Sequence, residues 1–161
     1  AACVATVNIG TILNREVSAM ETLDWMENLE NSFFNFSKGY KAPFCSIKDF
    51  IAKKITKSSM NTSYPLGIIE TPLWELLPKS VEASMRAGLK DVIRKMKGFE
   101  TGNIMGLESK SSAPIQVDRE KDGLCTGFEN LYVIGEGSGF AGGIISSAAD
   151  GVKSALSIIS S

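Results

Sequence analysis

The sequence predicts a mixed α/β fold of the α+β kind, in which a mainly helical first part is followed by a strand, a glycine-rich turn and a helix. Two observations carry this prediction. Apolar residues recur at helical spacing in two long stretches before residue 100. Near the end of the chain, the apolar run 131–134 leads directly into GEGSGFAGG at 135–143, and a segment of small and apolar residues follows.

The first element that we expect is a strand at residues 2–9, ACVATVNI, because β-branched and small apolar side chains dominate it. A helix follows over about 18–36. Ser18 and Glu21 have the spacing of a capping box, in which each side chain accepts a hydrogen bond from the other residue's backbone N–H. Apolar residues then recur at helical spacing along this stretch, so it should present one face to a core.

Glycines and prolines interrupt residues 37–78, so we expect loops and short helices there, one of them at 47–55. A second long helix is predicted over 79–97, where apolar residues share one face and Gly98 follows. Short strands are expected later in the chain; their predicted positions are 103–109, 114–117 and 130–134.

Composition excludes several classes of function. The formal net charge is −1, which gives no field to attract nucleic acid. The chain has no histidine and three widely spaced cysteines, so we expect neither a metal site nor a disulfide framework. No apolar run approaches the roughly 18 residues that a membrane span needs. These features favour a cytoplasmic protein, and a start without Met inside a strand-like pattern suggests a piece of a longer protein.

The glycine turn contains G-x-G-x-x-G, from Gly137 to Gly142. A complete dinucleotide-binding unit also needs a second strand with an acidic residue about 20 positions further on. Only 19 residues follow Gly142, and they read as one helix, so an independent Rossmann unit is disfavoured. The turn still suits a ligand, because the first turn of a helix presents unpaired N–H groups and Glu136 can accept hydrogen bonds from sugar-like hydroxyls.

The last helix, predicted to reach about residue 159, has small residues in its first half that would let it lie close to a flat ring or a sheet. Tight packing alone is the alternative explanation of these small residues. Its larger apolar residues recur at helical spacing and predict a buried stripe. The stripe consists of Ile145, Ala148, Val152, Leu156 and Ile159.

Residues 127–144, GFENLYVIGEGSGFAGGI, with SSAADG at 146–151, closely resemble the C-terminal motif of a bacterial family of FAD-dependent dehydrogenases. Segment 106–115 looks like a family segment that ends in T-S-S-P. The resemblance is strong from Leu76 onward and weaker before it. It implies that residues 1–100 are a substrate or cap region, mostly helical, inserted into a Rossmann-like FAD domain. Residues 101–161 would then supply the closing strand, turn and helix of that domain.

The resemblance also implies a site and partners. Glu136 would contact the ribityl hydroxyls, and Gly139–Gly143 would contact the carbonyl edge of the isoalloxazine. The ADP half of FAD would bind to the N-terminal remainder of a longer parent flavoprotein, which acts on a small-molecule substrate with NAD(P)H as a possible co-substrate. The implied cofactor-binding residues are Gly135, Glu136, Gly137, Ser138, Gly139, Phe140, Ala141, Gly142, Gly143 and Ile144, with Ser111 and Ser112 as further lining.

Some positions depart from the family pattern, because Lys110, Ala113 and Gln116 stand in and beside the T-S-S-P-like segment, where the family has arginines and proline. A turn without any ligand contact is the alternative role of Ser111 and Ser112. No residue is a convincing general acid or base; Glu136, Asp150 and Lys110 are the polar candidates near the loop, and catalytic residues stay unassigned. Two other functions remain open: a non-catalytic domain that folds alone without flavin, and a nucleotide-binding module.

Overall fold

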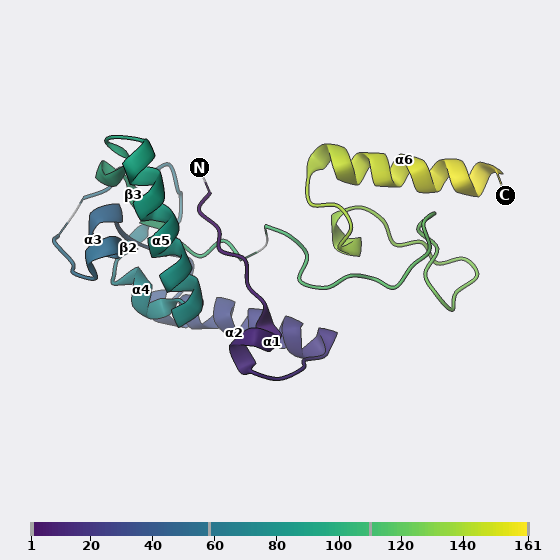
Figure 1. The fold of residues 1–161 in the computed structure, drawn as a ribbon, viewed down its shortest axis with the longest axis horizontal. Coiled ribbons are helices and arrows are strands. Elements are labelled where there is room, and N and C mark those ends of the chain that lie inside the picture. Colours follow the sequence, from purple (N-terminus) through teal and green to yellow (C-terminus); the bar gives the residue numbers. More distant parts are fainter. Residues whose placement is uncertain (1, 58, 110, 161) are drawn as a thin grey trace. The chain divides into compact units, whose positions relative to one another are not determined.

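The computed structural model describes residues 2–57, 59–109 and 111–160. They form two compact units: unit 1 consists of Ala1–Val17 and Asp24–Ser109, and unit 2 of Ser18–Leu23 and Lys110–Ser161. The mixed α/β fold that the sequence predicts is confirmed (Figure 1). In chain order the elements are α1 (Ile9–Leu13), α2 (Ala19–Ser37), β1 (Ala42–Ser46), α3 (Ile47–Ala52), β2 (Ile68–Glu70), α4 (Leu73–Leu76), α5 (Lys79–Lys95), η1 (Phe99–Thr101), β3 (Asn103–Met105), η2 (Glu136–Ser138) and α6 (Ile144–Ser160).

The predicted strand at residues 2–9 is wrong. Residues 2–8 have no regular structure, and Val4 is 61% exposed. A strand is stable only when a neighbour pairs with its backbone, and no strand among the described residues pairs with this segment. Asn8 instead begins α1, because its side chain accepts a hydrogen bond from the backbone N–H of Thr11.

Both long helices of the first part are confirmed. At the start of α2, the backbone N–H of Ser18 donates to Glu21 Oε2 at 2.8 Å, and the N–H of Glu21 donates to Ser18 Oγ at 3.2 Å. This is the capping box that the spacing predicts. Helix α5 ends three residues before Gly98, whose φ of +89° lies in the left-handed region that glycine adopts without strain.

Unit 1 contains a three-stranded sheet of order β2-β1-β3, with β1 parallel to β2 and antiparallel to β3. Strands β1 and β2 correct the prediction of only loops and short helices over 37–78. The first four residues of β1 are buried, so the strand lacks the alternation that marks a half-exposed strand. It also contains Pro43, which normally argues against a central strand. Strand β2 has three residues, too few for a periodicity.

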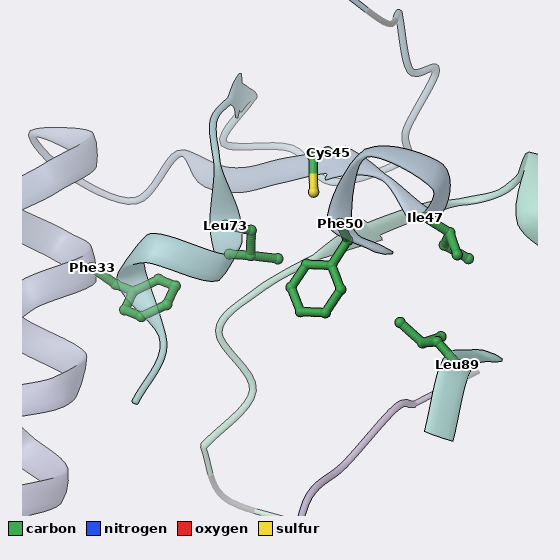
Figure 2. Packing of buried hydrophobic residues seen from close by; sticks show 6 residues of the cluster. All are labelled: Phe33, Cys45, Ile47, Phe50, Leu73 and Leu89. Atoms are coloured by element: carbon green, nitrogen blue, oxygen red, sulfur yellow. The ribbon is translucent and has the colours of Figure 1, made fainter. Parts of the chain in front are cut away.

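A hydrophobic core fills unit 1 (Figure 2). Phe50 and Cys45 are completely buried, and Leu73 and Leu89 are almost so. Burial raises the pKa of the Cys45 thiol to about 11, so this cysteine packs as a small neutral side chain. The buried members of the cluster come from one strand and four helices: Phe33, Cys45, Ile47, Phe50, Leu73 and Leu89.

Two buried carboxylates join the elements around this core. Asp49 accepts hydrogen bonds from the hydroxyl and the backbone N–H of Thr56, at 2.6 and 3.2 Å, which closes the loop after α3. Glu82 on α5 forms ion pairs with Lys53 at 2.9 Å and with Arg86 at 3.3 Å. The hydrogen bond from Lys53 and the positive charges hold the pKa of Glu82 below its usual value. Because Lys53 follows α3, this pair ties α3 to α5.

Unit 2 has little regular structure before its helix. The strands predicted at 114–117 and 130–134 are not formed; single bridges join Arg119 to Cys125 and Leu124 to Tyr132. A run of apolar residues becomes a strand only where a partner is available over several residues, and the described part of unit 2 offers 130–134 one bridging residue. The predicted last helix is confirmed as α6.

Candidate functional site

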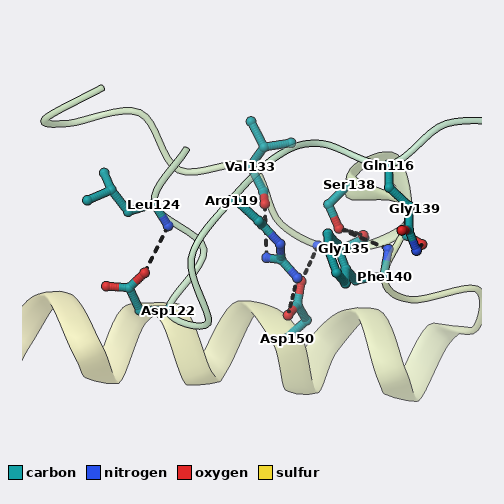
Figure 3. Close-up of polar contacts among 10 residues, drawn as sticks. All are labelled: Gln116, Arg119, Asp122, Leu124, Val133, Gly135, Ser138, Gly139, Phe140 and Asp150. Atoms are coloured by element: carbon teal, nitrogen blue, oxygen red, sulfur yellow. Dashed lines mark hydrogen bonds and ion pairs between the residues drawn. The ribbon is translucent and has the colours of Figure 1, made fainter. Parts of the chain in front are cut away.

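The candidate site is the glycine loop, residues 135–143, between the bridged segment of unit 2 and α6 (Figure 3). The chain turns at Gly135, which has φ 71° and ψ −155°, then forms the short helix η2 and turns again at Gly139, φ +81°. Ser138 is completely buried inside this turn, where its hydroxyl donates to the carbonyl of Gly135 at 2.6 Å. Hydrogen bonds within the loop therefore hold it in one defined conformation.

The three glycines of G-x-G-x-x-G have different reasons to be glycine. Gly139 is required by the chain itself: its φ is positive, and a Cβ atom there would lie 2.3 Å from the carbonyl oxygen of Ile115. Gly137 and Gly142 have backbones outside the left-handed region, and a Cβ atom on either would meet nothing within 4 Å. No packing within the described residues explains why these two positions lack a side chain.

Residues 116 and 117 form hydrogen bonds with the loop near its second turn, at Ser138 and Gly139. The backbone N–H of Val117 donates to the carbonyl of Ser138 at 3.0 Å, and Gln116 Nε2 donates to the carbonyl of Gly139 at 3.0 Å. The segment predicted as a strand at 114–117 thus supports the loop through single hydrogen bonds. Gln116, one of the departures from the family pattern, contacts the loop backbone directly.

An ion pair anchors the near end of the loop (Figure 3). Asp150 on α6 accepts a hydrogen bond from the N–H of Gly135 at 2.8 Å and one from Arg119 Nη2 at 2.9 Å. Arg119 Nη1 donates to the carbonyl of Val133 at 3.0 Å, and the guanidinium lies 4.4 Å from the ring centroid of Phe140. The Arg119 side chain is 6% exposed. One arginine therefore contacts the residues on both sides of the turn.

Most of the predicted contact residues lie in the glycine loop, and several face solvent. Glu136 is exposed, and its side chain makes no hydrogen bond or ion pair with the described part of the chain. Phe140 and Ile144 are 53% and 89% exposed. Ser111 and Ser112 are exposed in a bend, upstream of Ile115, whose carbonyl oxygen lies beside Gly139. Lys110 lies outside the described residues.

The apolar stripe predicted for α6 exists, but the prediction that it is buried is wrong. Ile145, Val152, Leu156 and Ile159 are between 59% and 82% exposed, and Ala148 is exposed as well. The face of α6 that packs within unit 2 carries small residues, and Ser154 on it is 2% exposed. Periodicity locates an apolar face on a helix, whereas the elements available to cover it decide whether that face is buried.

Small residues let α6 approach the rest of unit 2 closely. A Cβ atom on Gly123 would lie 2.5 Å from Ser154 Oγ, and one on Gly151 would lie 3.5 Å from Ile134. In the described part of the chain, no helix is both long enough and apolar enough to cross a membrane.

Sequence reasoning did not single out Arg119. It lies in the charged segment 118–123, where an arginine normally faces solvent. Asp150 was noted as a polar residue near the loop, and it carries a detectable signal: it is the first charged residue after Glu136, in a stretch of small and apolar residues. A carboxylate in such a stretch favours a specific partner, although the partner cannot be read from the spacing.

Comparison with known proteins gives the family. Residues 1–111 match the family described as FAD-dependent protein, C-terminal domain-like, and the chain belongs to this family. It is also 33% identical over 147 residues to an uncharacterized protein of Clostridium beijerinckii, over 88% of this chain and 28% of that relative. The chain thus spans less than a third of the length of this curated relative. The glycine loop lies beyond the range that matches the family.

Proposed function

We propose that this chain supplies the ribityl and isoalloxazine side of an FAD site in a longer oxidoreductase of the dehydrogenase type. The family is FAD-associated, and the proposal extends this association to the glycine loop. Glu136 accepts hydrogen bonds from the ribityl hydroxyls, and the backbone over 139–143 faces the carbonyl edge of the flavin ring. Ser111 and Ser112 are further lining. The flavin supplies the redox chemistry, and these residues orient it.

The observation that carries this proposal is the pair of glycines at 137 and 142. Neither needs to be glycine for its backbone conformation, and neither packs against the described residues. A glycine with open space at its Cβ position leaves room for another group to approach the backbone closely, and these two lie in the loop that we propose binds the flavin. A flat ring is a group that needs such an approach.

The hydrogen-bonding groups of the loop suit a flavin. Glu136 is exposed and acceptor-only when ionised, which matches hydroxyl donors. The backbone N–H groups of Ala141 and Gly142 have no hydrogen-bond partner within the described part of the chain, so they can donate to the carbonyl oxygens of the ring. Gly139 also has a structural reason to be glycine, because Ile115 and Gln116 fill the space where its Cβ atom would lie.

The exposed face of α6 supports a larger assembly. Apolar residues so close together cost free energy in water, at roughly 25 cal/mol for each Å² that could be buried. The alignment covers 28% of the relative, so that protein has a long further segment. We propose that this N-terminal remainder of the longer protein covers the face and binds the ADP half of FAD.

The activity of the whole protein is part of the same proposal. An NAD(P)H- or substrate-linked redox reaction on a small molecule, in the cytoplasm, fits a flavin site of this kind. The formal net charge of −1 supports neither a nucleic acid nor an anionic membrane surface as a partner.

The test uses alanine substitutions in the longer protein that carries this chain. Gly137→Ala and Gly142→Ala place a methyl group where we propose that the flavin lies, so each should lower the flavin content of the purified protein. Gly88→Ala is the matched control, since Gly88 on α5 also has open space at its Cβ position and no positive φ. The measurement is visible flavin absorbance per polypeptide, with unfolding midpoints to show that all three variants fold.

Equal flavin content in all three variants would contradict the proposal, as would a parent protein that purifies without flavin. For residues 1–161 alone we predict no tight FAD binding, because half a site must offset the whole cost of ordering the ligand. A yellow preparation of the isolated chain would show that this last prediction is wrong.

One observation favours a second candidate, a non-catalytic domain that folds without flavin. Unit 1 has its own hydrophobic core, which needs no ligand. The flavin content of the parent protein separates the two candidates.

A further inference from the structure

Arg119, which pairs with Asp150, contacts one residue before the first turn of the glycine loop and one residue after its second turn. Val133 precedes this turn, and its carbonyl accepts from Arg119 Nη1 at 3.0 Å. Phe140 follows the short helix η2, and its ring lies against the same guanidinium at 4.4 Å. Asp150 then links the guanidinium to the N–H of Gly135 at the turn itself. The contacts converge on one side chain that is 6% exposed.

The direction of the chain at Gly135 decides where the loop presents its polar groups. Glu136 follows directly, so a rotation about the backbone of Gly135 moves its carboxylate and the backbone of Gly137 together. Gly135 adopts φ 71° and ψ −155°, a conformation in which glycine itself has several neighbouring alternatives. The hydrogen bond that its N–H donates to the fixed carboxylate of Asp150 selects one of them.

Asp150 is well suited to this role because it is ionised at neutral pH. The hydrogen bond from Arg119, the N–H of Gly135 and the charges of Arg119 and Lys153 hold the pKa of this carboxyl below its usual value. A carboxylate can accept from the amide and from the guanidinium at once, with one oxygen for each.

We infer that Arg119 and Asp150 are positioning residues, which fix the backbone at Gly135 and thereby aim Glu136 and Gly137 at the flavin. This inference rests on the proposed flavin site. Neither residue contacts the flavin in this assignment; both act through the loop. The arrangement differs from a simple stabilising ion pair, because its hydrogen bonds end on the backbone of the loop.

The experiment compares Asp150→Asn with Asp91→Asn in the full flavin-loaded protein. Asp91 also pairs with two cations, Arg94 and Lys95, but on the exposed surface of α5 in unit 1. We expect Asp150→Asn to weaken flavin binding by about tenfold, the effect of one lost charge-assisted hydrogen bond. It should also shift the visible circular dichroism of the flavin that stays bound. Asp91→Asn should change neither.

Arg119→Lys gives a second test in the same protein. It keeps the positive charge but loses the planar fork that contacts Val133 and Asp150 together. If Arg119 only supplied charge, the lysine variant would bind flavin as the wild type does and show the same circular dichroism band. We expect weaker flavin binding and a changed band, while the unfolding midpoint stays close to that of the wild type.

Hydrogen exchange of the Gly135 amide measures the hydrogen bond between this amide and Asp150 independently of any flavin signal. Faster exchange of this amide in Asp150→Asn, with unchanged exchange in β1, is the expected result. Flavin affinity, dichroism and Gly135 exchange all within twofold of wild type would overturn the inference and leave the proposed function standing. A different result would remove the proposed function itself: the wild-type protein contains no flavin, while the Asp150→Asn variant still shows faster exchange of the Gly135 amide.

Discussion

Unit 1 and unit 2 hold their backbones in place by different interactions. Unit 1 packs Phe50, Leu73 and Leu89 into a closed hydrophobic core, and its buried carboxylates tie the surrounding helices together. The described residues of unit 2 bury one hydrophobic side chain, Cys125, and most of their specific contacts are hydrogen bonds and one ion pair. Many of the larger apolar side chains of unit 2 are exposed, several of them on α6.

Helices α5 and α6 show what the difference teaches. Both have 17 residues and an apolar stripe at helical spacing, so the sequence predicts a buried face for both. In α5 the stripe meets the core, and Leu89 is 3% exposed. In α6 the stripe faces outward, with Leu156 at 60%. The same pattern therefore describes one helix whose apolar face is covered and another whose apolar face is exposed.

The largest expected effect is in the core of unit 1. Phe50→Ala should lower the free energy of unfolding by about 3–5 kcal/mol, because it removes a completely buried ring and leaves a cavity. Denaturant unfolding of residues 1–161, followed by circular dichroism, measures this loss.

Phe128→Ala is the matched control in unit 2, where the side chain is 57% exposed and the change should stay within about 0.5 kcal/mol. Comparable losses at the two positions would break the distinction between the units.

An intermediate effect is expected at the ion pair between α3 and α5. Glu82→Gln keeps the shape of the side chain but removes the charge that Lys53 and Arg86 face. Lys53 is 43% exposed, which weakens the pair, so we expect a loss of about 1–2 kcal/mol at neutral pH. Urea unfolding of the variant measures it.

The pH dependence of this loss checks its cause. The folded-state pKa of Glu82 is below the ordinary value of 4.5, so its contribution is complete above pH 4.5 and is lost as the pH falls through the folded-state pKa. The stabilities of wild type and Glu82→Gln should therefore converge in acid. A difference that stays constant with pH would assign the loss to packing.

The smallest effect is expected on the exposed face of α6. Val152→Ser combined with Leu156→Ser should change the unfolding free energy of residues 1–161 by about 0.5 kcal/mol or less, because both side chains are already in water. Leu89→Ala on α5 should cost about 2–5 kcal/mol in the same assay.

In the longer protein, the double serine variant should instead lower stability and flavin content, because the face would then be covered. Unchanged behaviour in the longer protein would show that no other part of it packs on α6.

Much of the helical structure could be predicted because it depends on neighbours in sequence. The capping box of Ser18 and Glu21, the extent of α5 and the last helix all follow from spacings of three or four residues. The glycine loop could be located for the same reason. The strand expected at 103–109 is confirmed over β3, residues 103–105. Other strand predictions failed in both directions: residues 2–8 look like a strand and find no partner, whereas β1 contains Pro43 and becomes the centre of the sheet.

The polar anchor of the loop could be predicted only in part. Asp150 is conspicuous in its segment, but its partner lies 31 residues earlier, in a charged turn that resembles a solvated surface. The family match ends at residue 111, so it does not cover either residue. Their relationship depends on how the bridged segment folds back on α6.

The sequence by itself determined where the long helices lie, which of their faces are apolar and where the chain can turn sharply, because these properties arise from residues within one turn of each other. Tertiary structure decided which segments pair as strands, which apolar face is covered and which charge meets Asp150. Those outcomes depend on contacts between residues that are far apart in the chain, and such contacts form only when the whole backbone is in place.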